Sequence, residues 1–238
     1  MNAETLVSVC DVSRYYGDIC AVDKLNFEVR RGEVLGFLGP NGAGKSTTMQ
    51  IICGVLAPGD GSVSIAGHDI VDNAIDAKRQ LGFLPERPPL YMDQKVDEYL
   101  RYCASLRNVP SYGLPKALDN AKQRCGLEDY GKRLINNLSK GYQQRVGIAQ
   151  AIIHSPAVVI LDEPSSGLDP IQITEIRKLI AELGEDHSVI LSTHILPEVQ
   201  SSCDRVLIIN QGKLVLDAHV GALGKEEKLE ILNVAMHR

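Results

Sequence analysis

The sequence has no apolar run that approaches the ~20 residues needed to span a bilayer, so we expect no transmembrane segment. It also has no excess of basic residues, because 25 Lys and Arg stand against 30 Asp and Glu and the net charge is −5. Without a basic stripe to neutralise phosphates, a nucleic-acid partner is not expected. The first ten residues, MNAETLVSVC, lack the basic and long apolar regions of a signal peptide. We therefore expect a protein that is soluble by itself.

The cysteines form no CxxC pair, which argues against the common zinc and redox motifs. Each of the six lies in an apolar context, and they are scattered over the chain. Such thiols are typical of a protein in a reducing cytosol, and we expect them to be buried and unpaired. The six are Cys10, Cys20, Cys53, Cys103, Cys125 and Cys203.

Glycines gather in residues 39–47, GPNGAGKST, which match the phosphate-binding pattern GxxxxGK(S/T). An apolar strand at 34–38 runs into this loop and a helix-forming stretch at 47–53 leaves it. Backbone N–H groups converge on a polyphosphate only where side chains are absent, and the following helix N-terminus adds its positive end. An accidental match is expected in about one chain in a hundred of this length. We therefore predict nucleotide binding by Gly39, Pro40, Asn41, Gly42, Ala43, Gly44, Lys45, Ser46 and Thr47.

Hydrophobic patterning around the loop predicts an α/β fold. Continuous apolar runs at 158–161 and 189–191 are typical of parallel strands buried on both faces. Further strands are predicted at 6–12, 25–29, 62–66 and 81–84, with a hairpin at 205–209 and 213–216, and helices at 73–80 and 170–183. We expect residues 14–17 to form a turn that carries two tyrosines, one of which can stack on a nucleobase.

The pattern changes between residues 86 and 137, where no strand is predicted. Val96, Tyr99, Leu100, Cys103 and Leu106 follow the helical period, and further helical stretches run from 115 to 125 and from 139 to 154. We predict a helical lobe inserted into an α/β domain. The single domain would consist of a core at about 1–86 and 156–218, a helical subdomain at about 87–155 and a short C-terminal tail at 219–238.

Polar residues follow three apolar strands, after residues 38, 161 and 191. Because ligands of open α/β sheets bind outside the carboxyl ends of the strands, these residues are expected to converge on one nucleotide. Lys45 can reach the β- and γ-phosphates, and Ser46 and Asp162 have the positions of Mg²⁺ ligands in phosphate-loop ATPases. Glu163 can act as general base toward an attacking water. His194 can donate to the γ-phosphate, although a lone His at a strand end is more often a satisfied polar cap.

Taken in chain order, these motifs resemble the nucleotide-binding subunit of an ATP-binding cassette (ABC) transporter over residues 6–216. The matching positions are an aromatic A-loop at Tyr16, Walker A at 39–47, a Q-loop position at Glu86, a signature at 138–143, Walker B at 158–163, a D-loop at 167–169 and the switch histidine His194. The resemblance implies a P-loop NTPase with an ABC-ATPase core, a mixed sheet, an N-terminal antiparallel β subdomain and an inserted α-helical subdomain.

Two positions depart from the family pattern. The usual signature LSGGQ is replaced by LSKGY at 138–142, which keeps Ser139 and Gly141, adds a charge at Lys140 and loses the S-x-x-Q capping box at Tyr142. We still expect Ser139 to cap a helix and Gly141 to offer a bare N–H to a γ-phosphate. The Q-loop glutamine is replaced by Glu86, which can ligate Mg²⁺ but carries a charge.

The resemblance implies an ATP-hydrolysing subunit that uses ATP and Mg²⁺ and works as a head-to-tail homo- or heterodimer. Ser139, Gly141 and Asp169 would contribute across the dimer, Glu163, His194 and Lys45 would be catalytic, and Ser46, Glu86 and Asp162 would hold the metal. An integral membrane permease would dock near residues 86–91 and the helical lobe. The subunit would thus lie on the cytoplasmic face of a bacterial inner membrane. The strings at 82–86, 138–152, 167–173 and 192–199 are similar to a bacterial exporter branch of gliding-motility and multidrug type.

Two other functions fit the same motifs. A cytosolic ABC ATPase of translation or DNA repair usually has two cassettes or a long coiled coil, whereas this chain has one Walker A and a short helical lobe. A regulatory subunit without catalysis is disfavoured by Asp162, Glu163 and His194, and favoured only by Tyr142. The transported substrate is not encoded in these motifs.

Overall fold

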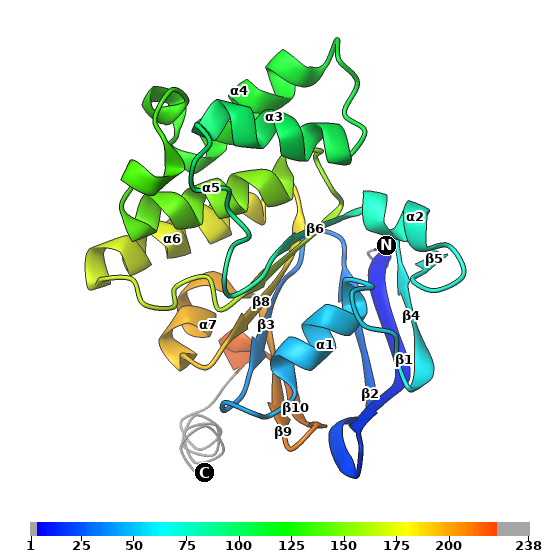
Figure 1. Cartoon of the computed structure of the whole chain (residues 1–238). Coiled ribbons are helices and arrows are strands. Elements are labelled where there is room, and N and C mark those ends of the chain that lie inside the picture. Colours follow the sequence, from blue (N-terminus) through cyan, green and yellow to red (C-terminus); the bar gives the residue numbers. More distant parts are fainter. Residues whose placement is uncertain (1–3, 223–238) are drawn as a thin grey trace.

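A computed structural model describes residues 4–222, which form two β-sheets and seven α-helices (Figure 1). The strands are β1 Thr5–Tyr16, β2 Ile19–Arg30, β3 Val34–Leu38, β4 Asp60–Ile65, β5 His68–Asp69, β6 Leu81–Leu84, β7 Val158–Asp162, β8 Ser188–Thr193, β9 Arg205–Asn210 and β10 Lys213–His219. The helices are α1 Lys45–Ile52, α2 Ala74–Arg79, α3 Val96–Leu106, α4 Leu114–Cys125, α5 Lys140–Ile152, α6 Pro170–Leu183 and α7 Leu196–Ser202. Short 3₁₀ helices lie at η1 Glu128–Tyr130, η2 Ile135–Asn137 and η3 Val220–Ala222.

The larger sheet has the strand order β10-β9-β3-β8-β7-β6, in which only β10 runs antiparallel to its neighbour. Its central strands are buried on both faces because each face is covered. In β7, Val158 and Ile160 belong to one apolar cluster with α1, whereas Val159 and Leu161 belong to another with α5 and α6. This double burial explains the continuous apolar run and confirms the predicted parallel strand.

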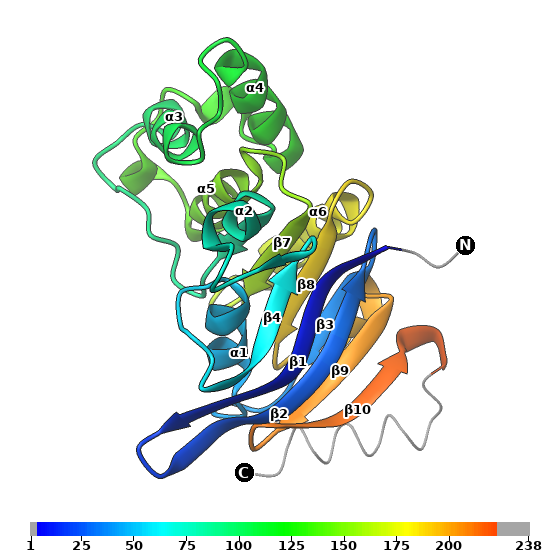
Figure 2. The ribbon, with the colours of Figure 1, turned by 90° about the vertical axis from the view of Figure 1, so that its right-hand side faces the viewer.

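The smaller sheet is antiparallel, with the order β2-β1-β4-β5, and in Figure 2 its blue and cyan strands lie beside the larger sheet. Its inner face packs with α1 and the larger sheet in one cluster, in which the rings of Phe27 and Phe37 are 5.7 Å apart. The predicted α/β fold with an N-terminal antiparallel sheet and an inserted helical part is therefore confirmed.

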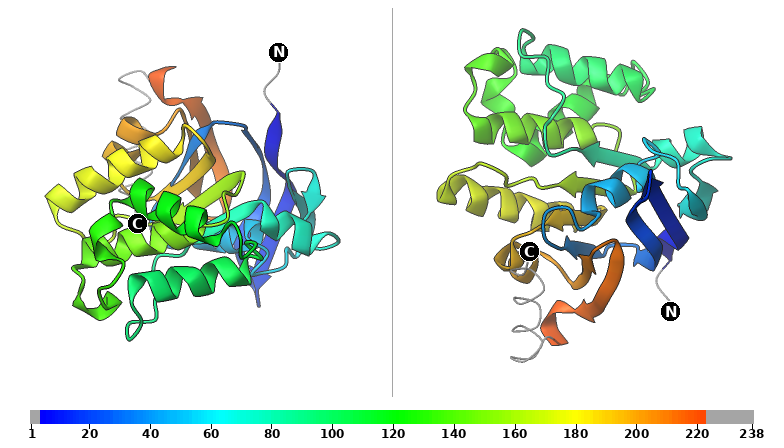
Figure 3. Two further views of the ribbon diagram at one scale, coloured as in Figure 1. Left: turned by 90° about the horizontal axis from the view of Figure 1, so that it is seen from above. Right: turned by 60° about the horizontal axis from the view of Figure 1, so that its bottom comes forward.

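Helices α3, α4 and α5 stack at the end of the molecule opposite β10 (Figures 1 and 3). Val96, Tyr99, Leu100 and Cys103 of α3 are buried there, as their spacing predicted. Leu106 was assigned to the same helical face by its spacing, and this prediction is wrong. Leu106 is the last residue of α3 and is 64% exposed. None of the helices within residues 4–222 has the length and apolar character to cross a bilayer.

Several predicted boundaries shift for local reasons. Strand β1 continues to Tyr16, so the predicted turn at 14–17 is wrong and the chain reverses at Gly17, which has a φ of 59°. Helix α1 begins at Lys45, two residues early, because Gly44 adopts a φ of 103° and turns the loop directly into the helix.

The cysteine prediction holds only in part. Cys53, Cys103 and Cys125 are buried, Cys20 and Cys203 are half-buried, and Cys10 is exposed because it lies on the outer face of β1. All six thiols are free. Residues 223–238 of the predicted C-terminal tail lie outside the described part of the chain.

The contact between α5 and β6 ties the helices to the larger sheet and has no room for an added methyl group. A Cβ atom at Gly82 would overlap the carbonyl oxygen of Ala151, which the helix backbone holds in place. We expect Gly82→Ala to lower the free energy of unfolding by about 1–3 kcal/mol in urea titrations. Gly221→Ala is the matched control, because a Cβ there meets open space. Equal stability of the two variants would contradict this packing.

Candidate functional site

The register of the larger sheet brings three strand ends to one level. Leu38 pairs with Thr193, and Asp162 pairs with Ser192, so the glycine loop, Glu163 and His194 begin side by side. The convergence predicted from three apolar strands with polar ends is therefore present. Ligands of parallel α/β sheets bind outside the carboxyl ends of the strands, which is the end of the sheet where these residues meet.

The glycine loop wraps the side chain of Lys45. Its ammonium donates to the carbonyl oxygens of Gly39 at 2.8 Å and Pro40 at 3.2 Å, and only 5% of the side chain is exposed. The loop also packs tightly against β2, because a Cβ at Gly44 would overlap the carbonyl oxygen of Ala21. The ammonium is thus fixed beside the backbone N–H groups that begin α1, where an anion is stabilised.

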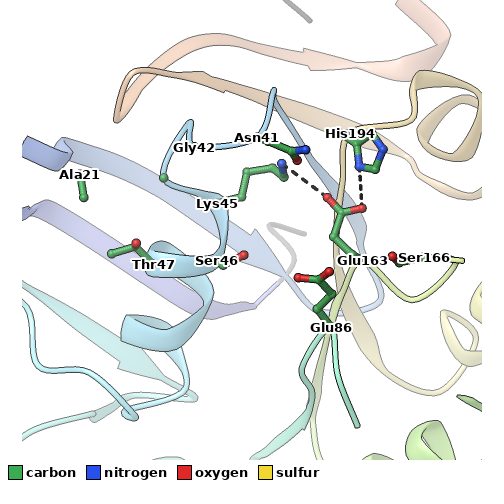
Figure 4. A pocket seen from close by; sticks show the side chains of 11 residues that line it. Ala21, Asn41, Gly42, Lys45, Ser46, Thr47, Glu86, Glu163, Ser166 and His194 are labelled. Carbon is green, nitrogen blue, oxygen red and sulfur yellow. Dashed lines mark hydrogen bonds and ion pairs between the residues drawn. The ribbon is translucent and has the colours of Figure 1, made fainter. Parts of the chain in front are cut away.

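A cavity of about 300 Å³ opens at this point (Figure 4). The predicted site residues that line it are Asn41, Gly42, Gly44, Lys45, Ser46, Thr47, Glu86, Glu163 and His194. Ala21 and Ser166 also line it, and sequence reasoning missed both. Ala21 carries no motif and reaches the cavity only because β2 packs against the loop, whereas the nearness of Ser166 to Glu163 in the chain was a usable signal.

Glu163 is the centre of the polar contacts in this cavity. Figure 4 shows its carboxylate between Lys45 and His194, with Oε1 3.4 Å from the Lys45 ammonium and Oε2 2.8 Å from His194 Nδ1. Burial raises the pKa of Glu163, and the neighbouring Lys45 and His194 offset only part of this effect. Its backbone has a φ of 48°, a strained conformation that aims the side chain into the cavity. A carboxylate with a raised pKa is suited to accept a proton.

The predicted metal ligands are oxygen donors beside the same cavity. Asp162 is buried, and its Oδ1 has no hydrogen-bond partner among the described residues. A buried carboxylate oxygen without a partner suits a cation, and Ser46 and Glu86 add a hydroxyl and a second carboxylate on the cavity wall. Within residues 4–222 there is no group of three His, Cys, Asp or Glu side chains that could hold a metal by itself. This donor set fits Mg²⁺, which commonly shares its coordination with water and phosphate oxygens.

The remaining predicted site residues do not line the cavity. These are Tyr16, Gly39, Pro40, Ala43, Asp162, Ser139, Gly141 and Asp169. Tyr16 is 48% exposed and carries the Arg14 guanidinium 5.5 Å from its ring centre. Asp169 caps α6, because its carboxylate accepts from the N–H groups of Ile171 and Gln172.

The signature begins α5, and Ser139 caps that helix by accepting from the N–H of Tyr142 at 3.4 Å. The ring of Tyr142 stacks on Tyr130 of η1, with ring centres 4.1 Å apart. The next residue, Gln143, donates from its side-chain amide to the carbonyl oxygens of Ile135 and Leu138. The stacked Tyr142 ring and the Gln143 side-chain amide therefore both hold the turn that precedes α5, although the usual glutamine at position 142 is absent.

The sheet, the glycine loop and the strand-end carboxylates define a P-loop nucleoside triphosphatase. A family model described as ABC transporter matches residues 22–166. The bacitracin transport ATP-binding protein BcrA of Bacillus licheniformis is 37% identical over 94% of this chain and 73% of its own length. The ABC transporter ATP-binding protein NatA of Bacillus subtilis is 33% identical, with 96% and 95% covered.

A solved structure agrees with these similarities. The cbiO1 protein of Clostridium perfringens, described as part of the ABC transporter complex cbiONQ, superposes with a TM-score of 0.85 at 29% identity, over 98% of this chain and 96% of that one. This chain belongs to the ABC transporter family, as one of its ATP-binding, ATP-hydrolysing subunits. A role in translation or DNA repair, or as a regulatory subunit without catalysis, is not favoured by these relatives.

The raised pKa of Glu163 has a consequence for stability. A carboxyl group whose pKa is higher in the folded state favours folding at low pH, and this contribution is lost as the pH rises through that raised pKa. The Glu163→Gln side chain cannot ionise, so the variant does not lose stability in this way as the pH rises. We expect the free energy of unfolding of the variant, relative to the unchanged protein, to rise as the pH rises from the ordinary pKa of a glutamate, about 4.3, through the raised pKa of Glu163. Thermal melts across this range measure it, and a difference that does not depend on pH would contradict it.

Proposed function

We propose that two copies of this chain, or one copy and a close relative, close head to tail on two ATP molecules before hydrolysis. The observation that carries this proposal is the division of the predicted site. Six residues of the glycine loop, Glu163 of Walker B and the switch histidine share one cavity, whereas Ser139 and Gly141 at the start of α5 lie outside it. A second subunit that presents its own α5 N-terminus to the cavity supplies a further anion-binding helix end and excludes water.

Within one half of this dimer, each side chain has a separate task. Lys45, held in the loop, stabilises charge on the β- and γ-phosphates. Glu163 orients the attacking water and accepts its proton, a task helped by its raised pKa. His194 is held at Nδ1 by Glu163, so its opposite ring edge is free to contact the γ-phosphate. The ring of Tyr16 stacks on the base.

The metal site consists of Ser46, Asp162 and Glu86. Their oxygen atoms are the ligands that Mg²⁺ prefers, and the bound ion supplies neutralisation of charge on the phosphates. Glu86 adds a negative charge that the usual glutamine lacks, whereas Lys140 adds a positive charge at the signature. We infer that both change the affinity for the metal and nucleotide without abolishing them. Asp169 lies at the dimer interface and senses the state of the neighbouring site.

A membrane permease completes the transporter. We place its docking surface at residues 86–91 and on the helical subdomain of residues 87–155, which is inserted between core segments 1–86 and 156–218, with 219–238 as a tail. Export is the direction we propose, supported by similarity to BcrA and to the probable multidrug protein YbhF of Escherichia coli, which is 32% identical over 89% of this chain and 37% of its own length. The subunit lies on the cytoplasmic face of the bacterial inner membrane.

Glu163→Gln tests the role of the general base. We expect steady-state ATP turnover to fall by about 10²–10⁴-fold, because the amide cannot accept the proton of the attacking water. Binding of a fluorescent ATP analogue should persist, since the phosphate loop is unchanged. Asp119→Asn on α4 is the control, because that carboxylate is 81% exposed and its ion pair with Lys122 is 3.8 Å long. Undiminished turnover in Glu163→Gln would remove Glu163 from the mechanism.

Mixing two inactive variants tests the shared site. Lys45→Ala should weaken binding of fluorescent ATP, and Ser139→Glu should place a negative charge where the partner's γ-phosphate lies. We expect each variant alone to lose about 10²-fold or more in turnover.

An equal mixture should recover about a quarter of full turnover, because half of the dimers are mixed and each mixed dimer keeps one intact site. A mixture as inactive as its parts, or a Ser139→Glu variant with full turnover, would overturn the head-to-tail dimer.

A further inference from the structure

Glu198 is a buried charged side chain outside the predicted nucleotide site. It lies on α7 and is 1% exposed. Its Oε2 accepts a hydrogen bond of 2.7 Å from the hydroxyl of Thr193, whereas its Oε1 has no hydrogen-bond partner within residues 4–222. The nearest cation is Arg177 of α6, whose Nη2 is 3.9 Å from Oε1. Because burial of a carboxylate is costly, an apolar side chain at this position would be the more stable choice if packing were its only task.

The partner of Glu198 places it next to the site. Thr193 is the last residue of β8, fully buried, and its hydroxyl also accepts a bond of 3.1 Å from the N–H of Ile195. The Thr193 hydroxyl oxygen therefore links the residues on the two sides of His194, because it belongs to Thr193 and binds the N–H of Ile195. A hydroxyl that donates to a carboxylate becomes a stronger acceptor, so Glu198 strengthens the bond that closes this turn.

His194 depends on that turn for its direction. Its side chain is 47% exposed, and a 2.8 Å bond from Nδ1 to Glu163 holds its ring. Neither Thr193 nor Glu198 lines the cavity. Their effect on a nucleotide must therefore pass through the backbone of residue 194.

We infer that Thr193 and Glu198 are positioning residues that hold His194 at the angle required for contact with the γ-phosphate. This inference rests on the proposed function, because it assigns His194 that contact. Arg177 extends the same contact to α6, the helix that Asp169 caps. The position of the histidine is thereby set by two neighbouring helices as well as by its own strand.

A double-mutant cycle tests the inference. Thr193→Val keeps the shape of the side chain and removes the hydroxyl, whereas Thr193→Ser keeps the hydroxyl. We expect Thr193→Val to lower kcat by about tenfold with KM for ATP nearly unchanged, and Thr193→Ser to retain at least about half of kcat. In a His194→Ala background, Thr193→Val should cause no further loss, because the residue that it positions is gone.

Ser188→Ala is the matched control. Ser188 is equally buried at the opposite end of β8 and bonds to Gly32 and Arg30. It should lower the melting temperature without changing the effect of His194→Ala. If Thr193→Val does not fold, Glu198→Leu enters the same cycle, with Glu198→Gln as the conservative variant that still accepts from Thr193.

The outcomes separate two failures. A Thr193→Val loss that is equally large with and without His194, or a Thr193→Ser variant as slow as Thr193→Val, overturns the positioning role alone. A His194→Ala variant with full turnover overturns the contact of His194 in the proposed function, and the positioning role with it.

Discussion

The structure depends on the pairing of one buried carboxylate. Glu163 follows β7 and is held between Lys45, which begins α1 after the glycine loop, and His194, which follows β8, and its negative charge is desolvated by the fold around it. Such a charge is tolerated only where cations and donors meet it closely. Because β3, β7 and β8 are parallel neighbours with matched register, their ends deliver those partners to one place. The strained backbone at Glu163 is supported by the same register.

The apolar layers explain how that edge stays rigid. Alternate apolar side chains of β7 and β8 pack into two separate clusters, one with α1 and the smaller sheet, the other with α5 and α6. The phosphate loop is clamped from outside by β2, against which Gly44 packs without space for a side chain. On the opposite side, α5 lies directly on the backbone of β6. The helix that begins with the signature is thus tied to the same sheet as the nucleotide cavity.

Most of this arrangement follows from the sequence because it depends on local rules. The glycine loop, the doubly buried strand at 158–161 and the caps by Ser139 and Asp169 require only a few neighbouring residues. Features that depend on long-range packing could not be predicted from the sequence pattern. Ala21 belongs to no motif, and Cys10 faces outward because of the register of β1. Helix α7 was not predicted because it is too short to show a helical period. Roles across a subunit interface, such as that of Gly141, are not determined by one chain and stay predictions.

The stacking of Tyr142 on Tyr130 connects the signature to residues outside its own five positions. Arg133 lies 4.8 Å from the centre of the Tyr130 ring and Arg145 lies 5.8 Å from that of Tyr142, so each ring of the stack also has a guanidinium group over it. A chimera in which only the five residues 138–142 are replaced by LSGGQ would leave Tyr130 without its aromatic neighbour. An exchange of the signature that keeps these contacts therefore has to include residues 130–145.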